Sequence, residues 1–184
     1  MGPQVHCLDN PNRRRIHGFL GMVIGFSEVN RSDLKEALEN PNVRAFLHAI
    51  RLGEGTSDEQ GYFRIVGGDH FSHFVDHPRA RRWISRYRVW STAAGAYQII
   101  SPTWDGLVRQ YGFTDFTPET QDEAAVALIA EKRALRHVKN GAIEKAIPLL
   151  RGVWASLPGA DGEQRQETMQ NVLAVYQAHG GVLA

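Results

Sequence analysis

The chain has 184 residues, of which 42% are hydrophobic and 22% charged, a balance typical of one globular domain. Its 21 Lys and Arg face 20 Asp and Glu, and this near-neutral charge excludes a strongly polyanion-seeking protein. The single cysteine, Cys7, excludes a disulfide framework and a cysteine-built zinc site, and no apolar run approaches the roughly 18 residues of a membrane span.

Residues 1–42 are predicted to form an N-terminal extension of unknown role. Three consecutive arginines, beginning at Arg13, precede an apolar run over residues 16–26 and crudely imitate an export signal. His17 and three glycines interrupt this run, and no small-residue cleavage site follows it. We therefore expect a surface extension or residues upstream of a true start at Met22.

The next segments are typical of helices. Ser32 and Asp33 are positioned to cap a short helix that ends before Pro41. A second helix follows, ends at Gly53, and has one apolar face at spacings of 3, 4 and 7, formed by Val43, Phe46, Leu47 and Ile50.

The middle of the chain changes pattern before helices return. Aromatic and β-branched residues between glycines predict a short strand or hairpin over residues 61–68, followed by an irregular loop. Proline at the first turn predicts helices that begin at Ser101 and Thr117, the first closed by Gly112 and the second ending near Gly141. Two last helices are expected over residues 143–154, with a break at Pro148, and 163–179. The sequence thus predicts one mainly helical domain with a small β insertion.

Glu54 is the first candidate for chemistry, because it stands where the second predicted helix runs out. The negative end of the helix macrodipole and partial burial would both raise the pKa of its carboxyl group. A carboxylic acid that stays protonated near neutral pH is what a general acid for glycoside cleavage requires. Solvated glutamates are also common near helix ends, so position alone leaves that alternative open.

Residues 69–77 hold three histidines and two aspartates, a composition that could bind zinc or iron. Their spacing matches no standard metal motif, and the intervening Phe71, Phe74 and Val75 are typical of packing. We therefore expect surface histidines on a loop, no metal site and no cofactor.

Residues 78–90 combine five arginines with Trp83, Tyr87 and Trp90 and contain no acidic residue. Interleaved aromatic and basic residues can bind single-stranded nucleic acid, or a carbohydrate polymer whose sugar faces stack on indoles while its acidic groups meet arginines. The alternative is an amphipathic element whose aromatic side chains enter the core. The small residues of segment 91–98 indicate closely apposed backbone or an ordinary turn into a helix.

Taken together, six segments resemble the bacteriophage lambda endolysin family, a group of lysozyme-like wall-degrading enzymes, over residues 43–181. Each segment is weak alone, but six in the same order are a strong signal. They are Gly53-Glu54-Gly55-Thr56, Ile65-Val66-Gly67-Gly68, Asp76-His77-Pro78-Arg79, Ser91-Thr92 with Gly95 and Tyr97-Gln98, residues 116–122, and Trp154-Ala155-Ser156-Leu157-Pro158-Gly159.

The resemblance implies a mainly helical, lysozyme-like α+β single domain with a small β-hairpin insertion and a cleft between two lips. Residues 43–184 would be its catalytic domain and Glu54 its catalytic residue. Residues 160–165 lack the aromatic side chains expected in the lower lip, and the connection over residues 56–62 is shorter than in the lambda member of the family. The implied substrate-binding residues are Tyr97, Gln98, Ser91, Gly95, Tyr62 and Asp76.

The implied reaction is cleavage of peptidoglycan between N-acetylmuramic acid (MurNAc) and N-acetylglucosamine (GlcNAc). In a lytic transglycosylase one carboxyl group suffices, with Glu54 acting as acid and then as base while a 1,6-anhydromuramic acid forms. The alternatives are a hydrolytic muramidase of the same fold, with a second carboxylate among four acidic residues, and a non-catalytic peptidoglycan-binding module. A nucleic-acid-binding protein that uses residues 79–88 is a further rival. The four acidic residues are Asp58, Glu59, Asp69 and Asp76.

The expected partner is the glycan strand of bacterial peptidoglycan, with no nucleic acid and no stable membrane insertion, and the protein is expected to be a monomer. Without a convincing export signal, we expect synthesis in the host bacterial cytoplasm and action on the wall in the periplasm. The resemblance also implies that a separate membrane-permeabilising protein releases it.

Overall fold

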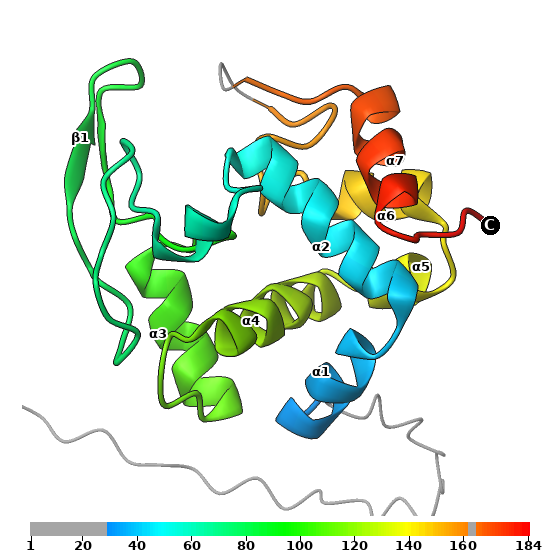
Figure 1. Ribbon diagram of the computed structural model, residues 1–184, viewed down its shortest axis with the longest axis horizontal. Coiled ribbons are helices and arrows are strands. Elements are labelled where there is room, and N and C mark those ends of the chain that lie inside the picture. Colours follow the sequence, from blue (N-terminus) through cyan, green and yellow to red (C-terminus); the bar gives the residue numbers. More distant parts are fainter. Residues whose placement is uncertain (1–28, 162–164) are drawn as a thin grey trace, which may run out of the picture.

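The computed structural model describes residues 29–161 and 165–184. Within these ranges the chain forms mostly α-helices, one 3₁₀ helix and a two-stranded sheet that lies at one end of the molecule (Figure 1). None of the helices described is long and apolar enough to cross a membrane. The elements are α1 (Arg31–Leu38), α2 (Pro41–Glu54), η1 (Glu59–Phe63), β1 (Arg82–Ile84), β2 (Val89–Ser91), α3 (Ser101–Tyr111), α4 (Pro118–Glu131), α5 (Leu135–Lys139), α6 (Ile143–Leu150) and α7 (Met169–Ala178).

Helix α2 is the centre of the fold, and α1, α4, α5 and α7 pack around it (Figure 1). Its first turn is capped by the side chain of Asn40, which accepts hydrogen bonds from two backbone amides, and proline occupies its first position. The helix ends where Gly55 adopts a left-handed conformation with φ of 68°. The predicted end at Gly53 is therefore one residue early, because Glu54 is the last helical residue and Gly55 is the C-cap.

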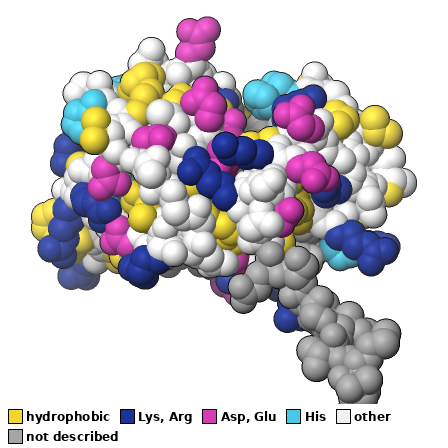
Figure 2. Space-filling model, turned by 90° about the horizontal axis from the view of Figure 1, so that it is seen from below, with side chains coloured by type: hydrophobic (Ala, Val, Ile, Leu, Met, Phe, Trp, Pro, Cys, Tyr) yellow, Lys and Arg dark blue, Asp and Glu magenta, His cyan; other side chains and the backbone are white. Residues whose placement is uncertain are grey.

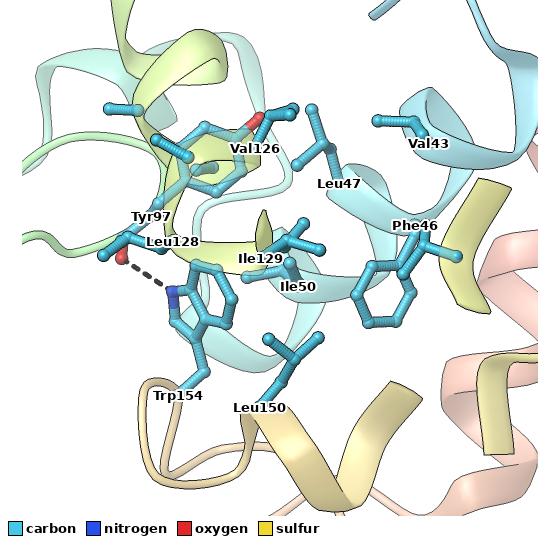
Figure 3. Close-up of a cluster of buried hydrophobic side chains, with 14 of the residues drawn as sticks. Val43, Phe46, Leu47, Ile50, Tyr97, Val126, Leu128, Ile129, Leu150 and Trp154 are labelled. Carbon is cyan, nitrogen blue, oxygen red and sulfur yellow. Dashed lines mark hydrogen bonds between the residues drawn. The ribbon is translucent and has the colours of Figure 1, made fainter. Parts of the chain in front are cut away.

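The hydrophobic core forms between α2, α4, α6 and the loop that follows α6 (Figure 3). The predicted apolar face of α2 is buried in it, as expected from its helical spacing. Trp154 closes one side of this core, and its indole Nε1–H donates to the carbonyl oxygen of Tyr97 at 3.1 Å. This bond joins two segments that are 57 residues apart in the chain.

Two of the later helices begin where the proline pattern predicted. Helix α3 runs from Ser101 to its C-cap Gly112, and α4 is capped by Thr117, whose hydroxyl oxygen accepts from the amide of Thr120. The predicted single helix to Gly141 is instead α4 and α5, because Arg133 adopts a positive φ of 59° between them. Helix α7 begins after its cap Thr168, later than the predicted residue 163.

The sheet lies in a different place from the strand that the sequence predicted. Residues 61–68 hold the end of η1 and single bridges rather than a strand pair. The hairpin is formed by β1 and β2, in antiparallel register with Trp83 opposite Trp90. Its alternation of side chains could not be recognised in the sequence, because each strand has only three residues and the turn over residues 85–88 carries two arginines and a tyrosine.

Helix α1 lies within the predicted N-terminal extension, yet it is part of the folded body. Leu34 and Ala37 are completely buried, α1 packs against α4, and Arg31 Nε lies 2.6 Å from Glu123 Oε2. The boundary predicted between residues 42 and 43 falls within the first turn of α2, and α1 on one side of it shares a core with α2. The imitation of an export signal over residues 16–26 lies outside the described residues.

Candidate active site at the end of helix α2

Glu54 lies in a pocket of about 280 Å³ between the hairpin and the loop after α6. The end of α2 carries the carboxyl group to this position, and the hairpin forms the opposite wall. Glu54 is the only acidic residue among those that line the pocket in the described part of the chain. The other lining residues are Val66, Ile84, Tyr87, Val89, Ser91, Ala93, Gln98, Ile100, Val153, Trp154 and Ala155.

The carboxyl group of Glu54 has the electrostatic character that the sequence predicted. Burial raises its pKa above the ordinary value, and a hydrogen bond from the Ser156 hydroxyl to Oε1, at 2.6 Å, partly offsets this rise. A raised pKa keeps a larger share of the group protonated near neutral pH. Glu54 can therefore donate a proton to a ligand in the pocket.

Removing the Ser156 hydroxyl should change the pH dependence of any reaction that needs protonated Glu54. The hydroxyl donates to the charged carboxylate and so lowers its pKa, which means that Ser156→Ala should raise the pKa further. Activity that requires the acid form falls as pH rises through this pKa. We expect the alkaline limb of the kcat/KM profile to move to higher pH in Ser156→Ala, and a limb that stays in place or moves to lower pH would contradict the assigned role of the hydroxyl.

Gly53 is what allows Ser156 to approach α2 so closely. A Cβ atom at Gly53 would lie 2.5 Å from Ser156 Oγ and 2.8 Å from its Cβ, closer than real contacts allow. Glycine inside a helix normally costs about 1 kcal/mol relative to alanine. Here the missing side chain leaves the space in which Ser156 lies, so the loop that carries Ser156 can reach Glu54.

Gly53→Ala should therefore destabilise the protein, although the same change usually stabilises a helix. The methyl group has to displace Ser156, and we expect a loss of about 1–3 kcal/mol in the free energy of unfolding. Gly106→Ala in α3 is the matched control, because a Cβ there meets nothing within 4 Å and should raise stability by about 1 kcal/mol. Urea unfolding should show a lower free energy of unfolding for Gly53→Ala and a higher one for Gly106→Ala.

Gln98 continues the site away from Glu54. It lines both the Glu54 pocket and a second pocket of about 360 Å³, which share Ile100, Val153 and Trp154 and so adjoin one another. The backbone of Gln98 has a positive φ of 47°, and its side-chain amide donates to the carbonyl oxygen of Gly95 at 2.9 Å. The structure thus brings together Glu54 and Gln98, two of the predicted site residues.

Tyr97 and Tyr62 lie together, but the structure does not bring their phenols into the Glu54 pocket. Both hydroxyl groups donate to Oδ1 of Asp122, a half-buried carboxylate on α4. Burial raises the pKa of Asp122, and the two tyrosine hydrogen bonds partly offset the rise. The guanidinium of Arg51 lies 4.6 Å from the Tyr62 ring centroid and donates to the backbone after Glu54, at Thr56 and Asp58. This cluster fixes the end of α2 through Arg51 and lies outside the Glu54 pocket.

The remaining predicted substrate-binding residues have different surroundings. Ser91 lines the Glu54 pocket. Gly95 has a φ of 76°, and a Cβ there would lie 2.2 Å from Gln121 Oε1, so glycine is required by close packing. Asp76 accepts from the Trp104 indole at 2.8 Å and from Arg79, contacts that fix the loop rather than reach the pocket.

The other acidic residues proposed as a second carboxylate do not line the Glu54 pocket. Asp58 pairs with Arg64 at 2.7 Å, Asp69 with Arg82 at 2.9 Å, and Asp76 with Arg79 at 3.1 Å. Glu59 is exposed at the start of η1.

The histidines of residues 69–77 divide into exposed and structural ones. His70 and His73 are exposed, whereas His77 is buried, bonds the carbonyl oxygen of Ile99 through Nε2 and accepts from the amide of Arg79 at Nδ1. Among the residues described here, no group of three or more His, Cys, Asp or Glu could hold a metal ion.

Two residues of the site escaped prediction. Ser156 lies in one of the segments that carry the family resemblance, but nothing in its local sequence shows that it meets a glutamate 102 positions away. Gln121 is completely buried, and its side chain bonds the amide of Ala96 and the carbonyl oxygens of Tyr62 and Phe116. A fully buried glutamine with three backbone partners positions neighbouring segments, and only the helical phase of α4 hinted that it points inward.

Comparison with known proteins identifies the family to which this chain belongs. The sequence model of the endolysin family matches residues 44–183. The chain belongs to the endolysin family. It is similar to the endolysin of Escherichia phage lambda, with 36% identity over 150 residues that cover 78% of this chain and 94% of the phage protein. It is likewise 36% identical to the endolysin of Escherichia phage P2, covering 78% of this chain and 95% of that protein.

The likeness extends to solved structures of the endolysin family. The lysozyme of bacteriophage lambda, solved in complex with a chitohexasaccharide, matches with a TM-score of 0.74 and 36% identity over 79% of this chain and 97% of that chain. A second structure of the lambda lysozyme matches with a TM-score of 0.71. These matches confirm the predicted family and the predicted lysozyme-like, mainly helical fold with its small hairpin.

Proposed function

We propose that this endolysin is a peptidoglycan lytic transglycosylase that cleaves the bond between MurNAc and GlcNAc. The observation that carries the proposal is a single raised-pKa carboxyl group, Glu54, in a pocket whose described lining holds no second acid. The similar lambda lysozyme has been solved with a chitohexasaccharide, a polymer of the GlcNAc type. The Glu54 pocket and the pocket that adjoins it at Gln98 together form a groove. A groove beside a protonated carboxyl group suits the same class of ligand.

In the proposed reaction Glu54 first acts as a general acid. Its proton passes to the glycosidic oxygen, and the bond from that oxygen to the MurNAc anomeric carbon breaks as oxocarbenium character develops. The GlcNAc part leaves as an alcohol, and Glu54 is left as a carboxylate that Ser156 stabilises through its hydrogen bond.

Glu54 then acts as a general base. It takes the proton of the MurNAc C6 hydroxyl while that oxygen attacks the anomeric carbon, which closes the 1,6-anhydro ring and returns Glu54 to its acid form. No water is consumed, and the intramolecular nucleophile benefits from proximity. The reaction needs one carboxyl group, which must hold a proton at the start and lose it easily. The opposing effects of burial and Ser156 on the pKa of Glu54 serve both needs.

A hydrolytic muramidase of the same fold is the alternative proposal. It would need a second carboxylate to activate water or to act as a nucleophile. Asp58, Asp69 and Asp76 are held in ion pairs with arginines, which makes each a weaker candidate. A non-catalytic glycan-binding module would have no use for a partly buried carboxyl group with a raised pKa, because its removal from water is unfavourable without a function.

Mass spectrometry of the soluble fragments from digested peptidoglycan tests the proposal. Transglycosylation should leave 1,6-anhydromuramic acid ends, one water lighter than hydrolysis products. Reducing muramic acid ends would overturn it in favour of the muramidase. No fragments, with binding retained, would favour the binding module.

The proposal includes where the enzyme acts. We infer that it is made in the host cytoplasm and reaches periplasmic peptidoglycan as a monomer once a separate protein permeabilises the membrane. It would bind glycan strands and no nucleic acid.

A further inference from the structure

The outer face of the β1–β2 hairpin carries an exposed aromatic pair. In the antiparallel register Trp83 lies opposite Trp90, while the neighbouring pair Ile84 and Val89 lines the Glu54 pocket from the other face. The two indole centroids are 5.5 Å apart, and the residues are 47% and 54% exposed. The hairpin therefore has one face in the groove and a second, aromatic face turned away from it.

One arginine without a carboxylate partner contacts this pair, and two more lie in the adjoining hairpin turn. The guanidinium of Arg81 stacks 4.8 Å from the Trp90 ring centroid, and Arg86 lies 5.5 Å from that of Tyr87 at the hairpin turn. In the described part of the chain Arg81, Arg86 and Arg88 form no salt bridge, whereas Arg82 is paired with an aspartate. Lys and Arg side chains lie beside hydrophobic ones along the left edge of Figure 2, the end where Figure 1 places the hairpin.

Such a surface is unfavourable in a protein that keeps it in water. Two half-exposed indoles leave apolar area unburied, and contiguous exposed apolar area rimmed by polar groups is typical of a binding surface. Tryptophan and arginine are also the side chains that contribute most to binding when they are covered. A suitable ligand offers apolar faces to the indoles and carboxylates to the guanidinium groups.

We propose that the outer hairpin face, formed by Trp83, Trp90 and Arg81 together with the exposed Arg88 of the adjoining turn, docks on a second peptidoglycan strand beside the one held in the groove. This inference rests on the proposed function. The C–H faces of amino sugars can stack on the two indoles, and the free carboxylates of peptide side chains can pair with the arginines. Peptidoglycan combines both groups in a polymer of adjacent strands, and the inner face of the same hairpin already borders the groove. The hairpin would sit between two strands and hold the enzyme on the wall between cleavages.

The test measures binding and turnover separately. Co-sedimentation with purified sacculi is followed for the Glu54→Gln protein, which cannot cleave them, with and without Trp83→Ala/Trp90→Ala or Arg81→Gln/Arg88→Gln. Each pair of changes should weaken binding about three- to tenfold, and the arginine pair should reduce its salt dependence. With Glu54 intact, the same variants should cleave short soluble glycan fragments at the normal rate, which also shows that the groove-lining face of the hairpin is still folded.

Matched controls lie elsewhere on the surface. Leu149→Ala removes an exposed apolar side chain from α6, and Arg109→Gln/Arg136→Gln removes two exposed charges, so both should leave sacculus binding unchanged. Unchanged binding in the hairpin variants would overturn the proposal. It would also be overturned if those variants lost binding only to phosphatidylglycerol vesicles or to a single-stranded 30-mer of DNA. Failure of the proposed function would show differently, as absent fragment release by the unmodified protein whatever its binding.

Discussion

Replacing Glu54 by Gln is expected to abolish fragment release from peptidoglycan, lowering the rate by about 10³-fold or more. Glutamine keeps the size of the side chain and can still bond Ser156, but it can neither donate the proton to the leaving oxygen nor take the one from the attacking hydroxyl. Turbidity loss of chloroform-treated cells and fragment analysis both measure the effect. Binding to sacculi should persist, because the groove is unchanged.

The stability of the Glu54→Gln protein separates lost chemistry from lost folding. Because burial raises the pKa of Glu54 in the folded state, the native protein binds its proton more tightly than the unfolded chain does. Stability from this group is present below pH 4.5, the ordinary value, and is lost as pH rises through the folded pKa. Glutamine does not ionise, so the variant is not destabilised as pH rises in this range. At neutral pH its Tm should therefore equal or exceed that of the unmodified protein. Asp58→Asn is the control, and it should keep most activity; residual lysis by Glu54→Gln near the normal rate would remove Glu54 from its role.

Replacing Gln121 by Leu is expected to give the largest loss of stability. The change keeps the volume but leaves the amide of Ala96 and the carbonyl oxygens of Tyr62 and Phe116 without their buried partner. At about 1 kcal/mol or more for each orphaned group, the free energy of unfolding should fall by about 3–4 kcal/mol. For a chain of this size that corresponds to a Tm lower by about 10 °C, measurable by calorimetry.

Gln177→Leu is the matched control for this prediction, because Gln177 is exposed on α7. It should change the Tm by little, as surface substitutions usually do. A Gln121→Leu protein as stable as the control would mean that water or rearranged backbone satisfies the three groups equally well. The role of Gln121 as the tie between α4, η1 and the segment before α3 would then be wrong.

Local rules predicted the helices better than the sheet. Proline at Pro102 and Pro118 and the apolar face of α2 act within a few residues, and the structure follows them. The hairpin could not be placed in the same way. A strand needs a partner strand, and in the predicted segment the ring of Phe63 instead packs on Phe71 and Phe74 as an aromatic cluster.

The candidate site was predictable to the same limited extent. Glu54 could be found because its position at the end of a predicted helix is a local signal, and its raised pKa agrees with that reasoning. Burial is the main physical cause, and burial depends on segments far away in the sequence. The orientation of Tyr97 shows the limit: its neighbour Gln98 enters the groove, while the phenol of Tyr97 turns to Asp122 on α4.

The contact between Glu54 and Ser156 spans 102 residues, and the indole bond from Trp154 to Tyr97 closes the same groove from the same late segment. During translation the acid leaves the ribosome long before its partners exist. Contacts of such long sequence separation form only when nearly the whole chain has been made. An unfinished polypeptide therefore carries Glu54 without Ser156 and Trp154, and the proposed site is complete only when nearly the whole chain has been made.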